Sequence, residues 1–249
     1  MVLQFALGVA IGFSLGLLGG GGSILTVPAL VYLVGQPPNS AIAASLVIVG
    51  ANSATGAMFH HRQGTLNWRV AAIFGGAGMV AAYLSAGLTA SFSPAVILIL
   101  FALLMLIIGI ALLRKKENKE NFITKSKSIS HIIGGGIIVG TLTGLLGVGG
   151  GFLIVPALTM LVGLPMHTAV GTSLAIIAAN SLAGFLGHLK MISLDPTLTL
   201  TFVFAGLIGS FAGVKLSSRI SSYSLQRIFA AFVIALALFI LYDNVTKLF

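Results

Sequence analysis

The chain contains no cysteine, which excludes disulfide bonds, thiolate metal sites and thiol redox chemistry. Charged residues are also scarce. They make up 7% of the 249 residues, whereas an ordinary soluble domain carries about 25%. Hydrophobic residues make up 57%, and the mean hydropathy is +1.12. Because such a chain cannot cover itself with polar surface, the sequence predicts a protein that crosses a membrane several times and has almost no domain outside it.

Acidic residues are the scarcest charged type. Only four are present, all in loops or at a segment end: Glu117, Glu120, Asp195 and Asp243. A carboxylate inside the membrane usually balances the charge of a transported cation, so its absence argues against a cation pump. The sequence also lacks a nucleotide-binding motif and a histidine spacing typical of a metal site. We therefore expect no enzymatic activity, cofactor or metal.

Basic residues outnumber acidic ones by 13 to 4, which gives a net charge of +9. Several of them gather in the linker 114–129: Arg114, Lys115, Lys116, Lys119, Lys125 and Lys127. Cytoplasmic loops of membrane proteins collect lysine and arginine, so we predict that this linker is cytoplasmic. Nucleic-acid binding is a poor alternative, because the run is short and contains a single aromatic residue.

The chain contains an internal repeat. Residues 12–113 align without a gap onto residues 140–241 at an offset of 128. The matching pairs include Val27-Pro28-Ala29-Leu30 with Val155-Pro156-Ala157-Leu158, Ser45-Leu46 with Ser173-Leu174, Asn52-Ser53 with Asn180-Ser181, Gly56 with Gly184, and His60 with His188. A duplicated apolar chain with interrupted segments at matching positions is typical of secondary transporters. The predicted organisation is repeat 1 (1–113), the linker, and repeat 2 (130–249).

Each half has four apolar stretches that could cross a membrane, since about 20 helical residues span the hydrocarbon core. They are 3–34, 40–60, 67–88, 93–113, 131–162, 168–188, 196–214 and 223–243. Residues suited to a first turn predict helix starts at Ser40, Asn67, Ser93-Pro94, Thr168 and Asp195-Pro196. The predicted fold is an all-α membrane protein with about eight spanning helices and two short half-helices.

The first stretch of each half is too long for one helix and is interrupted by glycines, at 19–22 and at 147–151. Each glycine costs about 1 kcal/mol inside a helix, so we predict a break followed by a half-helix, over 23–34 and 152–162. If each half-helix crosses the bilayer, the halves are inverted and 11 of the 13 basic residues share one side; otherwise the halves are parallel and 10 do. The charge bias therefore favours inverted repeats by a small margin.

The glycine breaks are the first candidate substrate site. Helix N-termini present unpaired N–H groups and a partial positive charge, and glycine lets a ligand approach the backbone closely. Two such starts near the membrane midplane would bind an anion without a buried cation. The residues concerned are Gly21, Gly22, Ser23, Gly149, Gly150 and Gly151. The alternative is that these glycines only allow tight packing and a bend.

Polar side chains at membrane depth are the second candidate. Asn52 and Asn180 lie in the middle of apolar segments, and Ser45 and Ser173 lie two turns before them on the same helical face. An amide at this depth is costly unless it is paired. Each asparagine is therefore either a substrate ligand or half of an interhelical hydrogen bond.

Two histidines, His60 and His188, follow these asparagines by another two turns. Imidazole has an ordinary pKa of about 6.5, which suits proton coupling. Each histidine is a candidate substrate ligand or proton carrier, with protons as the coupling ion. Alternatively, each histidine is a cap at the membrane interface, and any transported proton is carried by the substrate itself.

The repeated pattern resembles the TauE/SafE sulfite-exporter family, also called the TSUP family. The pattern is Gly-Leu-Leu-Gly-x-Gly-Gly-Gly, an apolar pair, Val-Pro-Ala-Leu, Gly, Pro, Ala, Ser-Leu, Asn-Ser, Gly and His, and it covers essentially the whole chain. In the first copy Gly20 and Ser23 stand where the second has Val148 and Gly151, so the two half-sites differ. The resemblance implies a transporter of sulfite, sulfoacetate, thiosulfate and related sulfur-containing anions.

The sequence and the resemblance together predict an exporter in the lipid bilayer of the bacterial inner membrane, driven by an ion gradient or the membrane potential. An anion channel, or an importer of other small organic anions, on the same fold is the alternative. A membrane scaffold without transport is disfavoured because it does not explain the paired polar residues at membrane depth. The exact substrate, the direction of transport and a homo-oligomeric state are left open.

Overall fold

The computed structural model describes residues 2–86, 94–114, 128–146, 151–188 and 195–245, which are helical throughout apart from short turns. The first half contains α1 (Val2–Leu18), α2 (Gly21–Pro28), the π-helical turn η1 (Ala29–Leu33), α3 (Pro38–Arg62), α4 (Trp68–Ala86) and α5 (Pro94–Arg114). The second half contains α6 (Ile129–Leu146), α7 (Gly151–Ala157), η3 (Leu158–Val162), α8 (Met166–His188), α9 (Pro196–Ser217) and α10 (Ser222–Val245).

Five described helices are long and apolar enough to cross a membrane: the segments Ser40–Arg62, Trp68–Ser85, Met166–Leu186, Pro196–Ser217 and Ser222–Tyr242. The remaining apolar helices are shorter in the described part of the chain, and they include α1 and the pieces that follow each break. The outer faces carry large exposed apolar side chains such as Tyr83, Phe204 and Phe239. The all-helical architecture agrees with the predicted all-α class, while the predicted number of about eight spanning helices stays a prediction, since five described helices meet the length and composition of a span.

The predicted break is present in the first half. α1 ends at Leu18, Gly19 has a φ of +76°, and α2 begins at Gly21. A positive φ favours glycine because a Cβ would be strained there. In the second half α6 ends at Leu146 and α7 begins at Gly151, while residues 147–150 lie outside the described part of the chain. The first break is therefore followed by a short helix rather than by a full span, and the described chain resumes after residue 150 with another short helix.

Two of the predicted helix starts are confirmed and two are wrong. Asn67 accepts a hydrogen bond from the Val70 amide at 3.0 Å, and Asp195 accepts one from the Leu198 amide at 3.1 Å, so both cap the helix that follows. Ser40 and Thr168 do not cap: α3 begins at Pro38 and α8 at Met166. In both helices a proline carbonyl, that of residue 37 or 165, accepts the first helical hydrogen bond. The fixed φ of proline suits this position, so the helix begins before the hydroxyl residue. The start predicted at Ser93-Pro94 agrees with α5 beginning at Pro94, while Ser93 lies outside the described residues.

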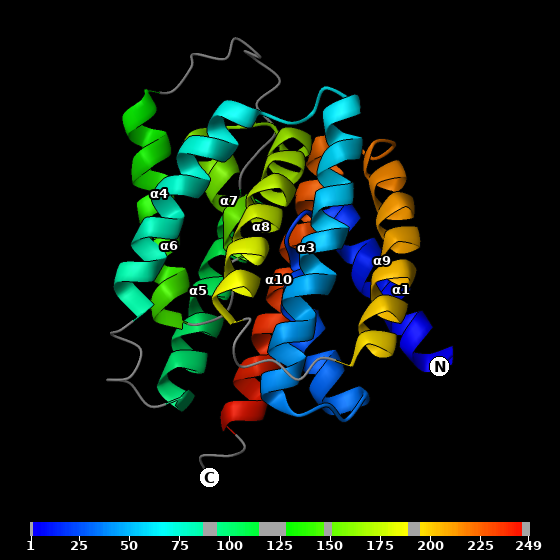
Figure 1. Ribbon diagram of the computed structural model, residues 1–249. Coiled ribbons are helices and arrows are strands. Elements are labelled where there is room, and N and C mark those ends of the chain that lie inside the picture. Colours follow the sequence, from blue (N-terminus) through cyan, green and yellow to red (C-terminus); the bar gives the residue numbers. More distant parts are fainter. Residues whose placement is uncertain (1, 87–93, 115–127, 147–150, 189–194, 246–249) are drawn as a thin grey trace.

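The two halves interlock, because helices of one half pack mainly on helices of the other (Figure 1). α1 packs on α9 and α4 packs on α6, each pair running in the same direction. α3 packs on α8, and α5 packs on α10, each pair running in opposite directions. Glycines allow the closest approaches: a Cβ on Gly12 would overlap the backbone of Gly206, and one on Gly140 would overlap that of Gly78. The core therefore belongs to both halves jointly.

Exposed basic residues gather at one end of the helix bundle. They occupy the end of α3, the start of α4, the end of α5, the end of α9 and the α9–α10 turn, and the start of α10: Arg62, Arg69, Arg114, Lys215, Arg219 and Arg227. Figure 1 shows all these helix ends at the top of the bundle. In the described residues the acidic Asp195 lies at the opposite end, where α9 begins. The bundle thus has one strongly basic end.

Candidate functional site

The starts of the two short helices meet inside the bundle. A Cβ on Gly20 would overlap the carbonyl of Gly151, and a Cβ on Gly151 would lie 2.5 Å from the Ser23 hydroxyl oxygen. That hydroxyl donates a hydrogen bond to the Gly20 carbonyl at 2.6 Å. Gly21 and Gly22 are buried, and Gly22 packs against the backbone of α1. Of the predicted glycine set, the structure therefore brings Gly151 against the first break, while Gly149 and Gly150 lie outside the described residues.

Ser173 connects this break to α8. Its buried hydroxyl lies 2.8 Å from the Val170 carbonyl and 3.2 Å from the Gly19 carbonyl, and it can donate to either. Ser45, 128 residues earlier, donates to the Ile42 carbonyl at 2.7 Å, the equivalent bond within its own helix. Ser173 therefore links α8 to the first break.

Asn52 is fully buried, and neither polar atom of its side chain has a hydrogen-bond partner. The amide lies against Gly206 of α9, where a Cβ would overlap Nδ2. The buried hydroxyl of Ser210 donates to the backbone carbonyl of Asn52 at 3.4 Å. A buried amide without partners costs about 1–3 kcal/mol. The interhelical hydrogen bond, one of the two roles considered for Asn52, is thus not made by this side chain.

Asn180 lies at the corresponding place in α8, and its buried Oδ1 also lacks a partner. It faces a cavity of about 30 Å³ between α4, α6, α7 and α8. The cavity is lined mainly by small and apolar residues, among them Gly78, Gly140, Thr143 and Ile154. Gly78 precedes Gly206 by 128 residues, so each asparagine faces the equivalent glycine of the other half. The Asn52 amide is tightly enclosed, whereas the Asn180 side chain borders a cavity.

His60 lies near the basic end of α3 and is 1% exposed. Its Nδ1 is 2.8 Å from the Thr65 hydroxyl oxygen, while its buried Nε2 has no partner. His188 ends α8, and its side chain lies outside the described residues. His60 packs on Gly171 near the start of α8. Since His188 is 17 positions after Gly171, the two histidines are about 26 Å apart along the helix. The structure does not bring the two histidines together.

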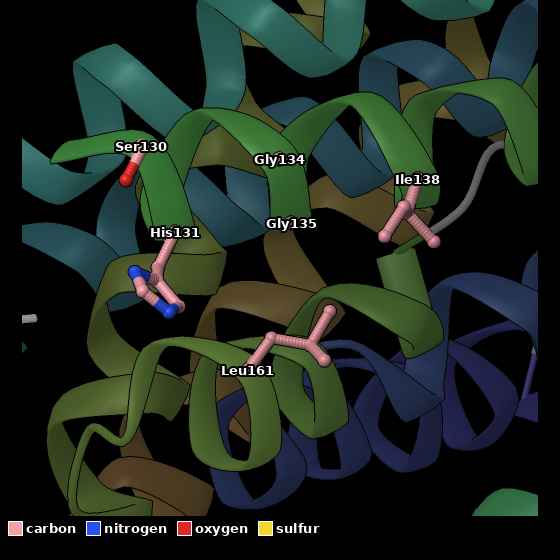
Figure 2. A pocket seen from close by; sticks show the side chains of 6 residues that line it. All are labelled: Ser130, His131, Gly134, Gly135, Ile138 and Leu161. Carbon is pink, nitrogen blue, oxygen red and sulfur yellow. The ribbon is translucent and has the colours of Figure 1, made fainter. Parts of the chain in front are cut away.

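A shallow groove of about 300 Å³ lies elsewhere, between α6 and η3. Figure 2 shows the side chains of His131 and Ile138 on α6 and of Leu161 on η3 along it. None of the predicted site residues lines this groove. In the described residues no group of three histidines or acidic residues could hold a metal ion.

Sequence reasoning missed the residues that enclose the predicted ones. Gly206 and Ser210 on α9 contact Asn52, and Gly171 contacts His60. Each contact joins the two halves at positions that the repeat does not relate. Only the periodicity of small residues along α9 signalled close packing there, and it did not identify the partner.

Apolar helices that enclose unpaired polar groups and a broken helix define the class: a multi-pass membrane protein of the transporter type. The chain belongs to the sulfite exporter TauE/SafE family, whose model matches residues 4–240. It is 34% identical over 250 residues to a probable membrane transporter protein of Xylella fastidiosa (strain 9a5c), covering 98% of this chain and 96% of that one.

Two more distant relatives are also described as probable membrane transporter proteins. One, from Bacillus subtilis (strain 168), is 28% identical over 88% of this chain and 89% of its own. The other, from Methanocaldococcus jannaschii, is 26% identical over 96% of both chains. No solved structure matches the chain. The protein is therefore a membrane transporter of the TauE/SafE family.

Proposed function

We propose that this protein is a secondary transporter of small sulfur-containing anions, of the sulfite, thiosulfate and sulfoacetate class, and that it exports them across the inner membrane. The observation that carries the proposal is the start of α2, where Gly20 to Ser23 meet Gly151 inside the bundle. Backbone N–H groups at such a start attract anions. The family supports the substrate class, and the shortage of acidic residues supports a negatively charged substrate.

In this proposal the polar residues around the break take the remaining contacts with the substrate. Ser173 offers its hydroxyl, Asn52 offers an amide whose two polar atoms lack partners, and Asn180 offers an unpaired Oδ1. Gly21, Gly22 and Ser23, with Gly149, Gly150 and Gly151, supply the backbone groups. Ser45, His60 and His188 complete the set taken from the sequence. Flux would be driven by an ion gradient, with protons as the candidate, or by the membrane potential.

The halves 1–113 and 130–249 would be inverted repeats. Support comes from the helix directions, since α3 and α8 run in opposite directions, and so do α5 and α10 (Figure 1). Inversion also explains why the basic residues of both halves share one end, which we assign to the cytoplasm together with the linker 114–129. Inverted repeats around a central site are the usual basis of alternating access.

This topology predicts from which side of the membrane each introduced cysteine can be labelled. The natural chain has no cysteine, so single cysteines can be introduced without background. Ser128→Cys and Ser218→Cys should react with an impermeant maleimide only from the cytoplasmic side, and Thr197→Cys only from the outside, because these exposed residues lie at opposite ends. Labelling in right-side-out and inverted vesicles measures this. Parallel repeats would place residues 128 and 218 on opposite sides, which would contradict the proposal.

The function itself is tested by flux into proteoliposomes. Sulfite, thiosulfate and sulfoacetate are supplied separately, with and without a pH gradient and with the membrane potential clamped. We expect saturable uptake of at least one of them that accelerates with a gradient, and no uptake of choline or sodium. Flux that neither saturates nor responds to a coupling gradient would favour the channel alternative. Absence of flux for all three anions would reject the substrate class.

A further inference from the structure

A histidine pair, of which His60 is buried and His167 is half-buried, lies at the basic end of the boundary between the two halves. His60 comes from α3, and His167 comes from the first turn of α8, close enough for the two imidazoles to interact electrostatically. A Cβ on Gly171 would lie 2.7 Å from the His60 Cβ. Since residues 167 and 171 are one helical turn apart, they share a face of α8. The pair thus arises from contact between the halves and not from the repeat.

The two contacts of the Thr65 hydroxyl favour one tautomer of His60. Both contacts are hydrogen bonds at once only if the hydroxyl donates to the His60 carbonyl at 3.2 Å and its oxygen accepts the Nδ1–H at 2.8 Å. With the proton on Nδ1, the neutral ring presents the lone pair of Nε2, and that atom is buried without a partner. Leaving a buried acceptor unpaired costs about 1–3 kcal/mol. A ligand with an O–H group would satisfy it.

The surroundings are basic and lie next to the break. Arg62 follows His60 by two residues, and Arg219 lies in the α9–α10 turn beside Ile220, whose backbone carbonyl faces the His167 imidazole. The neighbouring residue Val170 contacts Gly19, where a Cβ would lie 2.9 Å from the Val170 Cα. Adjacent residues of α8, Val170 and Gly171, therefore contact the first break and His60.

We propose that His60, oriented by Thr65, and His167 form an accessory site for a singly protonated oxyanion, such as hydrogen sulfite, at the basic end of the bundle. The ligand O–H donates to Nε2 of His60, and its negative charge is balanced by the basic end. An oxyanion without a proton would place an oxygen lone pair against the lone pair of His60 Nε2, and it would therefore bind poorly. The site thus rests on the proposed function and narrows its substrate to anions that carry their own proton.

The repeat sets a limit on this site. The residue 128 positions before His167 is Asn39, so the equivalent place in the first half has no second imidazole. The histidine pair can therefore exist at one end only. This difference makes His167→Asn the sharpest variant, because it gives the second half the residue that the first half already has.

The test uses the wild-type protein in detergent with labelled histidine. Its five histidines give five sets of imidazole ¹⁵N signals, assigned by single His→Gln variants. In mildly acidic buffer, where sulfite is largely singly protonated and sulfate is not, sulfite should shift the signals of residues 60 and 167, and sulfate should shift neither. Equal responses to both anions, or shifts confined to other histidines, would overturn the proposal.

Variants provide the second measurement. His167→Asn should weaken sulfite binding by about tenfold, the size of one contact to a charged ligand, because it removes the imidazole beside His60. His131→Gln, which replaces an exposed histidine near the same end, should not change it. Unchanged binding in a folded His167→Asn protein overturns the inference. The two failures are distinguishable. If proteoliposomes transport sulfite but the signals of residues 60 and 167 do not respond to it, only the histidine site is rejected. If proteoliposomes transport no sulfur-containing anion, the proposed function is rejected.

Discussion

Replacing Asn52 by leucine is expected to abolish transport while leaving the protein at least as stable as the natural one. Leucine is close to asparagine in shape, and it removes two buried polar atoms that have no partners. Removing an unpaired buried amide relieves a cost of about 1–3 kcal/mol. If the amide binds substrate during transport, the same change removes that contact, and flux should fall at least tenfold. Opposite effects on stability and flux would mark a functional residue.

The measurement pairs initial flux in proteoliposomes with the midpoint of thermal unfolding in detergent. Asn180→Leu should behave in the same way, with a smaller effect on stability because Asn180 is only partly buried and borders a cavity. Asn67→Leu is the matched control: this asparagine caps α4, so its loss should cost about 1 kcal/mol of stability. If Asn52→Leu lowers folded yield as much as it lowers flux, the amide is structural.

Gly12→Val should prevent the protein from folding. A Cβ at position 12 would overlap the carbonyl and Cα of Gly206, and backbone atoms cannot move aside as the end of a side chain can. Overpacking a well-packed interior costs about 1–3 kcal/mol, and more where the backbone must shift. Because α1 and α9 come from different halves, their separation would disrupt a major contact between the halves. We expect almost no monodisperse protein after size-exclusion chromatography.

Gly76→Val in α4 is the control for this experiment. Gly76 lies inside an apolar helix as Gly12 does, but a Cβ there meets nothing within 4 Å. Both variants therefore carry the same penalty for valine in a helix, and only one carries an overlap. Normal yield for Gly76→Val with loss of Gly12→Val locates the effect in the α1–α9 contact. Similar yields for both would show that the contact can relax.

The sequence predicted local features well where one residue determines the backbone. The break at Gly19 and the caps at Asn67 and Asp195 follow from backbone freedom and side-chain oxygens. It placed the starts of α3 and α8 two residues late, because a preceding proline carbonyl takes the role that was expected of a hydroxyl.

The surroundings of the site could not be predicted in the same way. The repeat relates His60 to His188, but two antiparallel helices bring equivalent residues together only near their crossing point. Far from that point His60 meets the start of α8 instead. Asn52 likewise meets α9, a helix to which no sequence match connects it. Contacts between non-equivalent residues of two halves depend on the packing angle of the helices, and the pattern of one sequence does not contain that angle.

The pairing of α1 with α9 has a consequence for biosynthesis. α1 is made first and leaves the ribosome long before α9, which begins at Pro196. During that interval the glycine-lined surface of α1 faces lipid or the insertion machinery, without the helix that it fits. Fewer residues separate α4 from its partner α6, so the interval before α4 can pack is shorter. Final assembly must therefore follow the insertion of nearly the whole chain, and a product truncated before α9 would leave the membrane with a helix whose packing surface has no partner.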